Sequence, residues 1–214
     1  MNAQQLSTLF PGLETELYTE LEQTGTIKEI PADSTVLRKG QTIRSAILLL
    51  EGVIKLYQED EDGGEFFMYH INPGEACAVS MVCSYQPETS NVLATAVTDA
   101  TVLLIPLSAM DQWMAKYKSW HYFVIQSYRS RYNELLNTIG EIAFRNMDER
   151  LEFYIRKQVK QFGHQIRLTH QEIANDLNSS REVISRLMKK MEKNEWIIQH
   201  RNSFEWIKDD RSVA

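Results

Sequence analysis

The spacing of apolar positions changes along the chain, and each change predicts a different kind of structure. Between residues 6 and 24, leucines and one phenylalanine recur three or four positions apart, which predicts a short helical opening segment. Short runs rich in Ile, Val, Leu, Phe and Tyr then follow at intervals of about ten to twelve positions. The clearest of these predicted strands are 46–50, 53–57, 66–71 and 100–105. From Ser108 onward the helical spacing returns.

Glycines separate the short runs, at Gly40, Gly52, Gly63, Gly64 and Gly74. Evenly spaced strands with glycine turns between them are typical of an antiparallel sandwich or roll. The sequence therefore predicts an α+β protein whose residues 1–115 form an N-terminal antiparallel β-roll of the jelly-roll type.

A long amphipathic stretch follows this predicted roll. Ser108 can cap a short helix, and an apolar stripe then runs from Trp120 to Ala143. Some 24 helical residues span roughly 36 Å, which is longer than a small roll needs for its own cover. We expect residues 116–144 to form a dimerisation helix whose surplus apolar face meets a second copy of the chain. The alternative is a helix buried entirely against its own roll.

Residues 145–214 read as a separate C-terminal domain. Asn146 and Glu149 have the spacing of a capping box, which predicts a helix that ends near Gly163. The region holds 14 Lys and Arg against 11 Asp and Glu, a net charge of +3. Since the whole chain has a net charge of −6, residues 1–144 carry −9. An acidic first part and a basic second part suggest that only the second faces an anionic partner.

The remaining composition is that of an ordinary globular protein, with 43% hydrophobic and 24% charged residues. No apolar run approaches the 18 or so residues of a membrane helix, and the first residues lack the pattern of a signal peptide. Two cysteines are too few for a disulfide framework. We therefore expect a cytoplasmic protein with no membrane partner.

Residues 169–207 hold the most specific pattern in the chain. Two short helices are predicted with a tight turn between them, and the second carries basic residues. The signs are a capping box, a residue suited to a left-handed turn and a second capping box: Thr169 with Glu172, Asn178, and Ser179 with Glu182. Residues 197–207 then predict a hairpin. Together these elements predict a winged helix-turn-helix.

The second helix presents side chains that suit the edges of DNA bases. Arginine offers a planar fork that matches guanine O6 and N7, glutamate accepts from cytosine N4, and serine can do either. The predicted base-contacting residues are Arg181, Glu182, Ser185 and Arg186. The plain alternative is that Glu182 and Arg186 form only a surface ion pair one helical turn apart.

Other polar residues of this region suit the phosphate backbone, which fixes the register of a protein on a duplex. Hydroxyl groups and backbone donors at the helix starts can hold phosphate oxygens, as can the lysines of the second helix and an arginine of the wing. The predicted phosphate-contacting residues are Thr169, Ser179, Ser180, Lys189, Lys190 and Arg201, with Lys193 beside them.

These motifs resemble a known family. The stretch LTHQEIA at 168–174, followed by SSREVISR at 179–186, closely resembles the cyclic-AMP receptor and fumarate-nitrate regulator (Crp/Fnr) superfamily of transcription regulators. The resemblance extends over nearly the whole chain. It implies that Arg181, Glu182 and Arg186 read a half-site containing G·C, and that Ser185 occupies a base-contacting position used in the fumarate-nitrate branch.

The resemblance also implies partners. A homodimer would bind a roughly palindromic operator of double-stranded DNA, with half-sites about one helical turn apart. The family implies activation by contact with RNA polymerase, although repression fits the same residues. An effector or a redox change in a cyclic-nucleotide-binding-like roll would control DNA binding.

The effector pocket departs from the family's pattern. Gly74 and Glu75 match the pair whose carboxylate would bind a ribose hydroxyl. Ser90 and Asn91 stand where an Arg-Ser pair would hold the phosphate, and Leu135 and Leu136 stand where polar residues would contact the purine. Without the arginine a buried phosphate loses its bidentate partner. We expect no binding of cyclic AMP in the usual mode, and no cofactor is assigned.

Cys77 and Cys83 lie where the phosphate-binding segment should be. They can be core residues, or a redox switch, a thiol pair with a lowered pKa, or partial ligands of a metal. We expect no iron–sulfur cluster, because the clusters of this family need four cysteines and the chain has two. Haem could bind through His70 or His121. The alternative is that each is a core histidine whose ring nitrogens are hydrogen-bonded within the protein.

Two other functions could use the same predicted elements. A β-roll can also be a metalloenzyme of the cupin type, but the five histidines are scattered and no catalytic triad, P-loop or dinucleotide fingerprint occurs. We therefore expect no enzyme activity and no metal site. A helix-turn-helix that mediates only protein contacts is the other rival, and it predicts no salt-dependent binding of duplex DNA.

Overall fold

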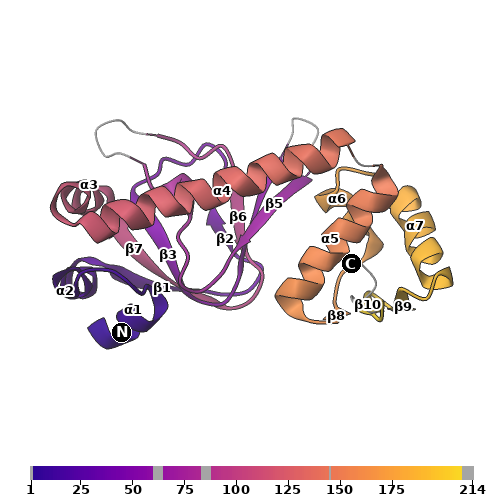
Figure 1. Cartoon of the computed structure of the whole chain (residues 1–214), viewed down its shortest axis with the longest axis horizontal. Coiled ribbons are helices and arrows are strands. Elements are labelled where there is room, and N and C mark those ends of the chain that lie inside the picture. The colour runs from indigo at the N-terminus through magenta and orange to yellow at the C-terminus, as the bar shows by residue number, and fades with distance from the viewer. Residues whose placement is uncertain (1, 60–64, 83–87, 145, 209–214) are drawn as a thin grey trace. The chain divides into compact units, whose positions relative to one another are not determined.

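The computed structural model describes residues 2–59, 65–82, 88–144 and 146–208 (Figure 1). The chain divides into two compact units. The first comprises Met1–Gln58 and Met68–Leu136, and the second comprises Glu59–Phe67 and Asn137–Ala214.

Two helices open the chain, where the sequence had predicted one segment over 6–24. They are α1 (Ala3–Leu9) and α2 (Thr15–Thr24). The prediction of a single segment was wrong because Pro11 lacks the backbone donor of a helix interior and Gly12 adopts a positive φ of 91°. The apolar spacing nevertheless marks the buried side chains, which include Leu6, Leu17 and Leu21.

Seven strands form the predicted roll. They are β1 (Thr26–Ile30), β2 (Thr35–Leu37), β3 (Ser45–Glu51), β4 (Ile54–Glu59), β5 (Glu65–Ile71), β6 (Leu93–Ala96) and β7 (Ala100–Pro106). One sheet has the order β1-β7-β3 and the other β2-β6-β4-β5. The pairs β1·β7, β3·β7, β2·β6 and β4·β6 are antiparallel, as the glycine-punctuated pattern predicted.

Two of the predicted glycine turns require glycine for two reasons. Gly52 has a φ of +85°, and a Cβ atom there would lie 2.3 Å from the carbonyl oxygen of Asp99. Gly74 has a φ of +86°, and its Cβ would lie 2.5 Å from the carbonyl oxygen of Leu9. Both the backbone conformation and the close approach of another backbone exclude a side chain.

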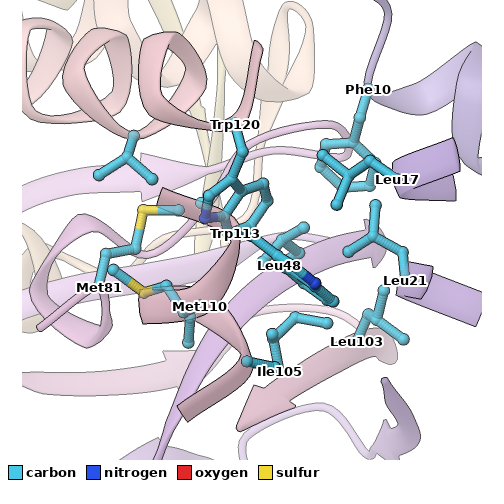
Figure 2. Packing of buried hydrophobic residues seen from close by; sticks show 14 of the residues in the cluster. Phe10, Leu17, Leu21, Leu48, Met81, Leu103, Ile105, Met110, Trp113 and Trp120 are labelled. Carbon is cyan, nitrogen blue, oxygen red and sulfur yellow. The ribbon is translucent and has the colours of Figure 1, made fainter. Parts of the chain in front are cut away.

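The first unit has two apolar clusters. One fills the space between the sheets and includes Leu49, Leu56 and Tyr69. The other lies beneath the helices α3 (Leu107–Lys116) and α4 (Lys118–Phe144) and includes residues of α1 and α2. Figure 2 shows Trp113 and Trp120 at its centre. Their ring centroids lie 5.4 Å apart and their rings are inclined by 85°.

The start of α3 differs from the sequence prediction. Pro106 is the N-cap residue, so Ser108 lies inside the first turn and does not cap the helix. The last strand residue, β7's Pro106, leads directly into the helix, which leaves no loop for Ser108 to occupy.

The long helix is present and spans 27 residues. Trp120 and Val124 bury one face against the roll of their own unit. Beside this face the helix carries a stripe of exposed apolar side chains: Tyr122, Ile125, Tyr128, Tyr132, Leu135, Leu136 and Ile139. The alternative of a helix buried entirely against its own roll is therefore wrong.

The second unit begins its globular part with α5 (Met147–Phe162), which has the predicted Asn146–Glu149 capping box and ends at Gly163. It continues with β8 (Gln165–Ile166), α6 (His170–Asp176), α7 (Arg181–Lys193), β9 (Ile197–His200) and β10 (Ser203–Trp206). The strands form an antiparallel sheet of order β8-β10-β9. The predicted winged helix-turn-helix is confirmed element by element.

None of the helices within the described ranges combines the length and the apolar character needed to cross a membrane.

Candidate nucleic-acid interface and sensor pocket

Local capping fixes the two helices of the helix-turn-helix. The Thr169 hydroxyl accepts a hydrogen bond from the backbone N–H of Glu172, and the Glu172 carboxylate accepts one from the backbone N–H of Thr169. The predicted capping box of α6 is therefore confirmed. Asn178 adopts a φ of +47°, as predicted for the turn. The capping box therefore fixes where α6 begins, and Asn178 supplies the left-handed residue of the turn before α7.

The cap of α7 lies one residue later than the sequence predicted. Ser180, not Ser179, is the N-cap residue, and its hydroxyl oxygen accepts from the Val183 backbone at 3.3 Å. The backbone N–H of Ser179 is already bonded to the carbonyl oxygen of Ala174, 2.9 Å away. The predicted capping box of Ser179 with Glu182 is therefore wrong, because the hydroxyl that caps α7 belongs to Ser180.

One face of α7 is buried and the other is exposed. Ile184, Leu187, Met188 and Met191 pack into the core of the second unit. Arg181, Glu182 and Arg186 are exposed on the other face. The fold therefore presents these three predicted base-contacting side chains to solvent, on consecutive turns of one helix.

Glu182 is held charged by the start of its helix. Hydrogen bonds from its own backbone N–H and from the Ser180 hydroxyl lower the pKa of the Glu182 carboxyl. At neutral pH it is an acceptor-only group, as contact with an amino group of cytosine requires.

Ser185 differs from its neighbours because it is half-buried and hydrogen-bonded. Its Oγ lies 3.0 Å from Nδ1 of His170, the first residue of α6. The other ring nitrogen of His170 lies 2.9 Å from Oε1 of Gln199 on β9. The amide of Gln199 in turn donates to Glu192 near the end of α7. Sequence reasoning missed His170, Gln199 and Glu192, since no local spacing links them.

The predicted phosphate-contacting residues fall into two groups. Lys189, Lys193 and Arg201 are exposed. Lys190 is ion-paired with Asp148 of α5, and the hydroxyls of Thr169 and Ser180 serve as helix caps. Ser179 is half-buried.

A hollow lies between the start of α6, the start of α7 and the wing. Its volume is about 340 Å³, and Thr169, His170, Arg181, His200 and Asn202 line it together with their neighbours. Its polar lining and its place next to the exposed face of α7 suit a segment of sugar-phosphate backbone.

Comparison with known families matches both units of the chain. Residues 27–117 match the model of the cyclic nucleotide-binding domain, and residues 149–209 match the Crp-like helix-turn-helix domain. The chain belongs to the Crp/Fnr superfamily of transcription regulators. This Crp/Fnr regulator is accordingly a DNA-binding transcription regulator.

Relatives of this Crp/Fnr regulator are distant but match along most of their length. A CRP-like cAMP-activated global transcriptional regulator of Mycobacterium tuberculosis is 21% identical over 88% of this chain and 87% of the relative. A global nitrogen regulator of Synechocystis is 23% identical over 86% and 83%.

Solved structures share the fold of this Crp/Fnr regulator. A transcriptional regulator of the Crp/Fnr family from Eubacterium rectale superposes with a TM-score of 0.81 at 19% identity, over 95% of this chain and 96% of that one. The c-di-GMP responsive global regulator CLP of Xanthomonas campestris superposes with a TM-score of 0.79 at 16% identity, over 92% and 100%.

Glu75, predicted to bind an effector, contacts an arginine that sequence reasoning missed. Arg131 of α4 donates to the Glu75 carboxylate at 2.9 Å and to Glu134 at 2.7 Å, and its guanidinium lies 4.3 Å from the ring centroid of Tyr69. Its side chain is 10% exposed. Burial alone would lower the pKa of Arg131, but the carboxylates of Glu134 and Glu75 outweigh it and raise the pKa.

Glu75 is therefore already engaged within the chain. The same carboxylate oxygen, Oε2, accepts from the Asn72 backbone at 2.8 Å and from Arg131. A ribose hydroxyl would have to compete with a charged donor for this carboxylate. Gly74, beside it, forms the tight turn described above.

The other predicted pocket residues do not offer a phosphate site. The Ser90 hydroxyl is buried and bonded to both the carbonyl oxygen and the N–H of Val92, at 2.7 and 3.2 Å. Asn91 is exposed. Leu135 and Leu136 belong to the exposed stripe of α4 and do not line the roll of their own chain. These residues do not fit a cyclic nucleotide held in the usual mode.

Cys77 is a core residue in this fold. Its thiol is buried, and burial raises its pKa, which disfavours the reactive thiolate. This speaks against a thiol pair with a lowered pKa. Cys83 lies outside the described residues.

The described part of the chain contains no cluster of metal-binding side chains. Within it, no group of three or more His, Cys, Asp and Glu side chains could hold a metal ion. His121 is exposed on α4, and His70 lies on β5 with its carbonyl oxygen accepting from Arg131 at 3.5 Å.

Proposed function

We propose that this regulator acts as a homodimer that reads a palindromic operator with α7 in successive major grooves, under the control of an effector bound in the roll. One observation carries the proposal: α7 buries its apolar face in the second unit and exposes Arg181, Glu182 and Arg186. Three side chains with complementary hydrogen-bonding groups on one exposed helical face suit base readout. We propose that Ser185 contacts a base beside them.

The backbone of the duplex would be held around this helix. Lys189, Lys193 and Arg201 supply exposed charge, and the hollow beside Arg181 and His200 would take the adjoining phosphates. Thr169, Ser179 and Ser180 contribute through the helix starts that they form or flank. Lys190 would have to leave Asp148 to join them.

Dimerisation would use residues 116–144. The exposed stripe of α4 repeats every three or four residues and includes Tyr132, 61% exposed, and Ile139, 52% exposed. A second copy of the same helix would bury both stripes at once, as two-fold symmetric interfaces do. The two recognition helices would then meet half-sites about one turn of DNA, roughly 34 Å, apart.

The family membership also supports a contact with RNA polymerase and action in the cytoplasm, where a regulator meets the chromosome. We propose both as parts of the same function. The proposal includes no catalytic activity.

The effector of the roll would differ from cyclic AMP bound in the usual mode. Glu75 is engaged by Arg131, and no cation stands at Ser90 or Asn91 for a phosphate. We propose that an effector acts by changing the Arg131–Glu75 contact, because this contact joins the roll to α4. A coupling of about 1–3 kcal/mol between effector and DNA would suffice for regulation.

Binding to DNA tests the proposal directly. A duplex selected from a random library is titrated with the full chain, and affinity is followed by fluorescence anisotropy at several salt concentrations. We expect affinity to fall steeply with salt. Arg181→Ala should cost about 1–3 kcal/mol and relax the preference at one base position.

The matched control is Arg38→Ala, which removes an exposed arginine from the roll. This variant should bind like the unchanged protein. If Arg181→Ala and the unchanged protein bind every selected duplex equally, the assignment of Arg181 to a base contact is wrong. If no duplex binds with a dependence on salt, the helix-turn-helix would serve protein contacts instead.

Thermal unfolding tests the effector part. Addition of cyclic AMP should leave the Tm of the full chain unchanged, and a saturable rise in Tm would contradict the proposed departure from the usual mode.

A further inference from the structure

A chain of hydrogen bonds joins the wing to the base-reading face of α7. It runs from Glu192 on α7 to Gln199 on β9, then to His170 at the start of α6, and ends at Ser185 on α7. The three distances are 2.9, 2.9 and 3.0 Å. All four residues belong to the second unit.

The chemistry of these groups fixes the direction of every hydrogen bond. The Glu192 carboxylate only accepts, and it takes both the backbone N–H and the side-chain amide of Gln199, each at 2.9 Å. The Gln199 amide nitrogen therefore faces Glu192, and its oxygen faces His170. Because that oxygen also only accepts, Nε2 of His170 carries the proton.

A neutral imidazole with its proton on Nε2 has a lone pair on Nδ1. The Ser185 hydroxyl must then donate its single hydrogen to Nδ1 of His170. Only lone pairs of Ser185 remain for any other partner. A residue that is usually both donor and acceptor becomes acceptor-only.

We propose that His170 is a positioning residue that sets the base preference of Ser185 by making its hydroxyl an acceptor. This inference rests on the proposed function, in which Ser185 contacts a base. In the major groove the acceptor would select a base that offers an amino group, adenine through N6 or cytosine through N4. Thymine and guanine present acceptors at the corresponding edge and would be disfavoured.

Protonation of His170 would reverse this preference. With both ring nitrogens protonated, Nδ1 donates to Ser185, and the hydroxyl hydrogen becomes free for thymine O4 or guanine O6. The charged or titratable groups around the imidazole are Arg181 and His200, which line the same hollow, Glu172 in the first turn of α6, and Glu192 through Gln199.

The test measures preference rather than affinity alone. Four duplexes differ only in the base pair that Ser185 faces, and the full chain is titrated with each at pH 8. We expect binding to be about 3- to 10-fold tighter for the amino-bearing base, the range of one neutral hydrogen bond. Ser185→Ala should remove this preference.

His170→Phe keeps an aromatic ring but frees the Ser185 hydroxyl to donate or accept. We expect the preference to fall to within about twofold, a fraction of one hydrogen bond, while the preferences at the Arg181 and Arg186 positions persist. Gln199→Leu removes the oxygen that keeps the proton of His170 on Nε2, so this variant should weaken the base preference in part. Arg38→Ala, an exposed position of the roll, is the control and should change nothing.

Acidity provides a readout that a purely structural role would not move. Protonation of the His170 imidazole by acid should shift the unchanged protein towards thymine or guanine at this position, and the same acidification should leave His170→Phe unchanged. A preference that shifts equally in both proteins would overturn the inference.

The free protein offers a readout that needs no DNA. Long-range proton–nitrogen NMR should show the proton of His170 on Nε2, and a proton on Nδ1 would overturn the inference by itself. Specific DNA binding with a preference that survives His170→Phe overturns the inference and leaves the proposed function intact. Failure of the unchanged protein to bind any duplex overturns both.

Discussion

Single residues in this molecule take their roles from burial as much as from chemical type. Arg131 lies seven positions after Val124 and eleven after Trp120, so it continues the buried stripe of α4 with a charged group. An arginine at an apolar position of a helix is a signal that sequence reasoning could have used. Its partners, Glu75 and Tyr69, come from other elements and could not be paired with it from spacing alone.

Cys77 shows the same dependence on burial. The sequence left it open between a core residue and a reactive thiol, and the raised pKa of the buried thiol favours the first. In a Cys83→Ser background, we expect a thiol reagent to label Cys77 only after denaturation, because both thiolate and access are lacking. Labelling is followed by absorbance in native buffer and in guanidinium chloride. Stoichiometric labelling of the native protein within minutes would contradict this.

Elements of the helix-turn-helix begin where a side chain can satisfy a free backbone donor. Asn146 and Thr169 were identified correctly because each capping box is complete within four residues. The cap of α7 was placed one residue too early, since two adjacent serines satisfy the same pattern. The hydrogen bond from the Val183 N–H to the Ser180 hydroxyl decides between them.

The two serines form a matched pair for experiment. Ser180→Ala should lower the free energy of unfolding by about 0.5–2 kcal/mol, because the Val183 N–H loses its cap. Ser179→Ala should lower the free energy of unfolding by a smaller amount. Urea denaturation followed by tryptophan fluorescence measures both. An equal or larger loss from Ser179→Ala would show that the cap is misplaced.

At the scale of the whole molecule, the exposed stripe of α4 is the feature that a single chain leaves unexplained. An isolated helix gains little from seven exposed apolar side chains, and a surface of this kind marks an interaction site. Effector control would pass through the same helix, because Arg131 of α4 contacts Glu75 of the roll.

A charge placed within the stripe should separate the subunits. We expect Leu136→Asp to weaken the dimer by at least about tenfold, since each subunit would bury an unpaired carboxylate. Light scattering coupled to size-exclusion chromatography measures the mass across a dilution series. Val97→Asp, an exposed apolar position of the roll, is the control and should leave the mass unchanged. A Leu136→Asp protein that stays dimeric at all concentrations would refute the interface.

The sequence by itself determined the features that are local. Glycine turns, capping boxes, the strand spacing and the turn at Asn178 each depend on a few neighbouring residues, and so the roll, the long helix and the winged helix-turn-helix followed from pattern. The outward projection of Arg181 and Arg186 followed as well, because helical periodicity alone separates them from Ile184 and Leu187.

The tertiary structure alone decided the contacts between distant elements. The Arg131–Glu75 pair is 56 residues apart in the chain, and His170 meets Ser185 and Gln199 at separations of 15 and 29. Such contacts depend on how helices and strands pack, and side-chain spacing carries no record of it. For this reason α7 could be predicted from the sequence, whereas the groups that orient Ser185 and the arginine that contacts Glu75 could not.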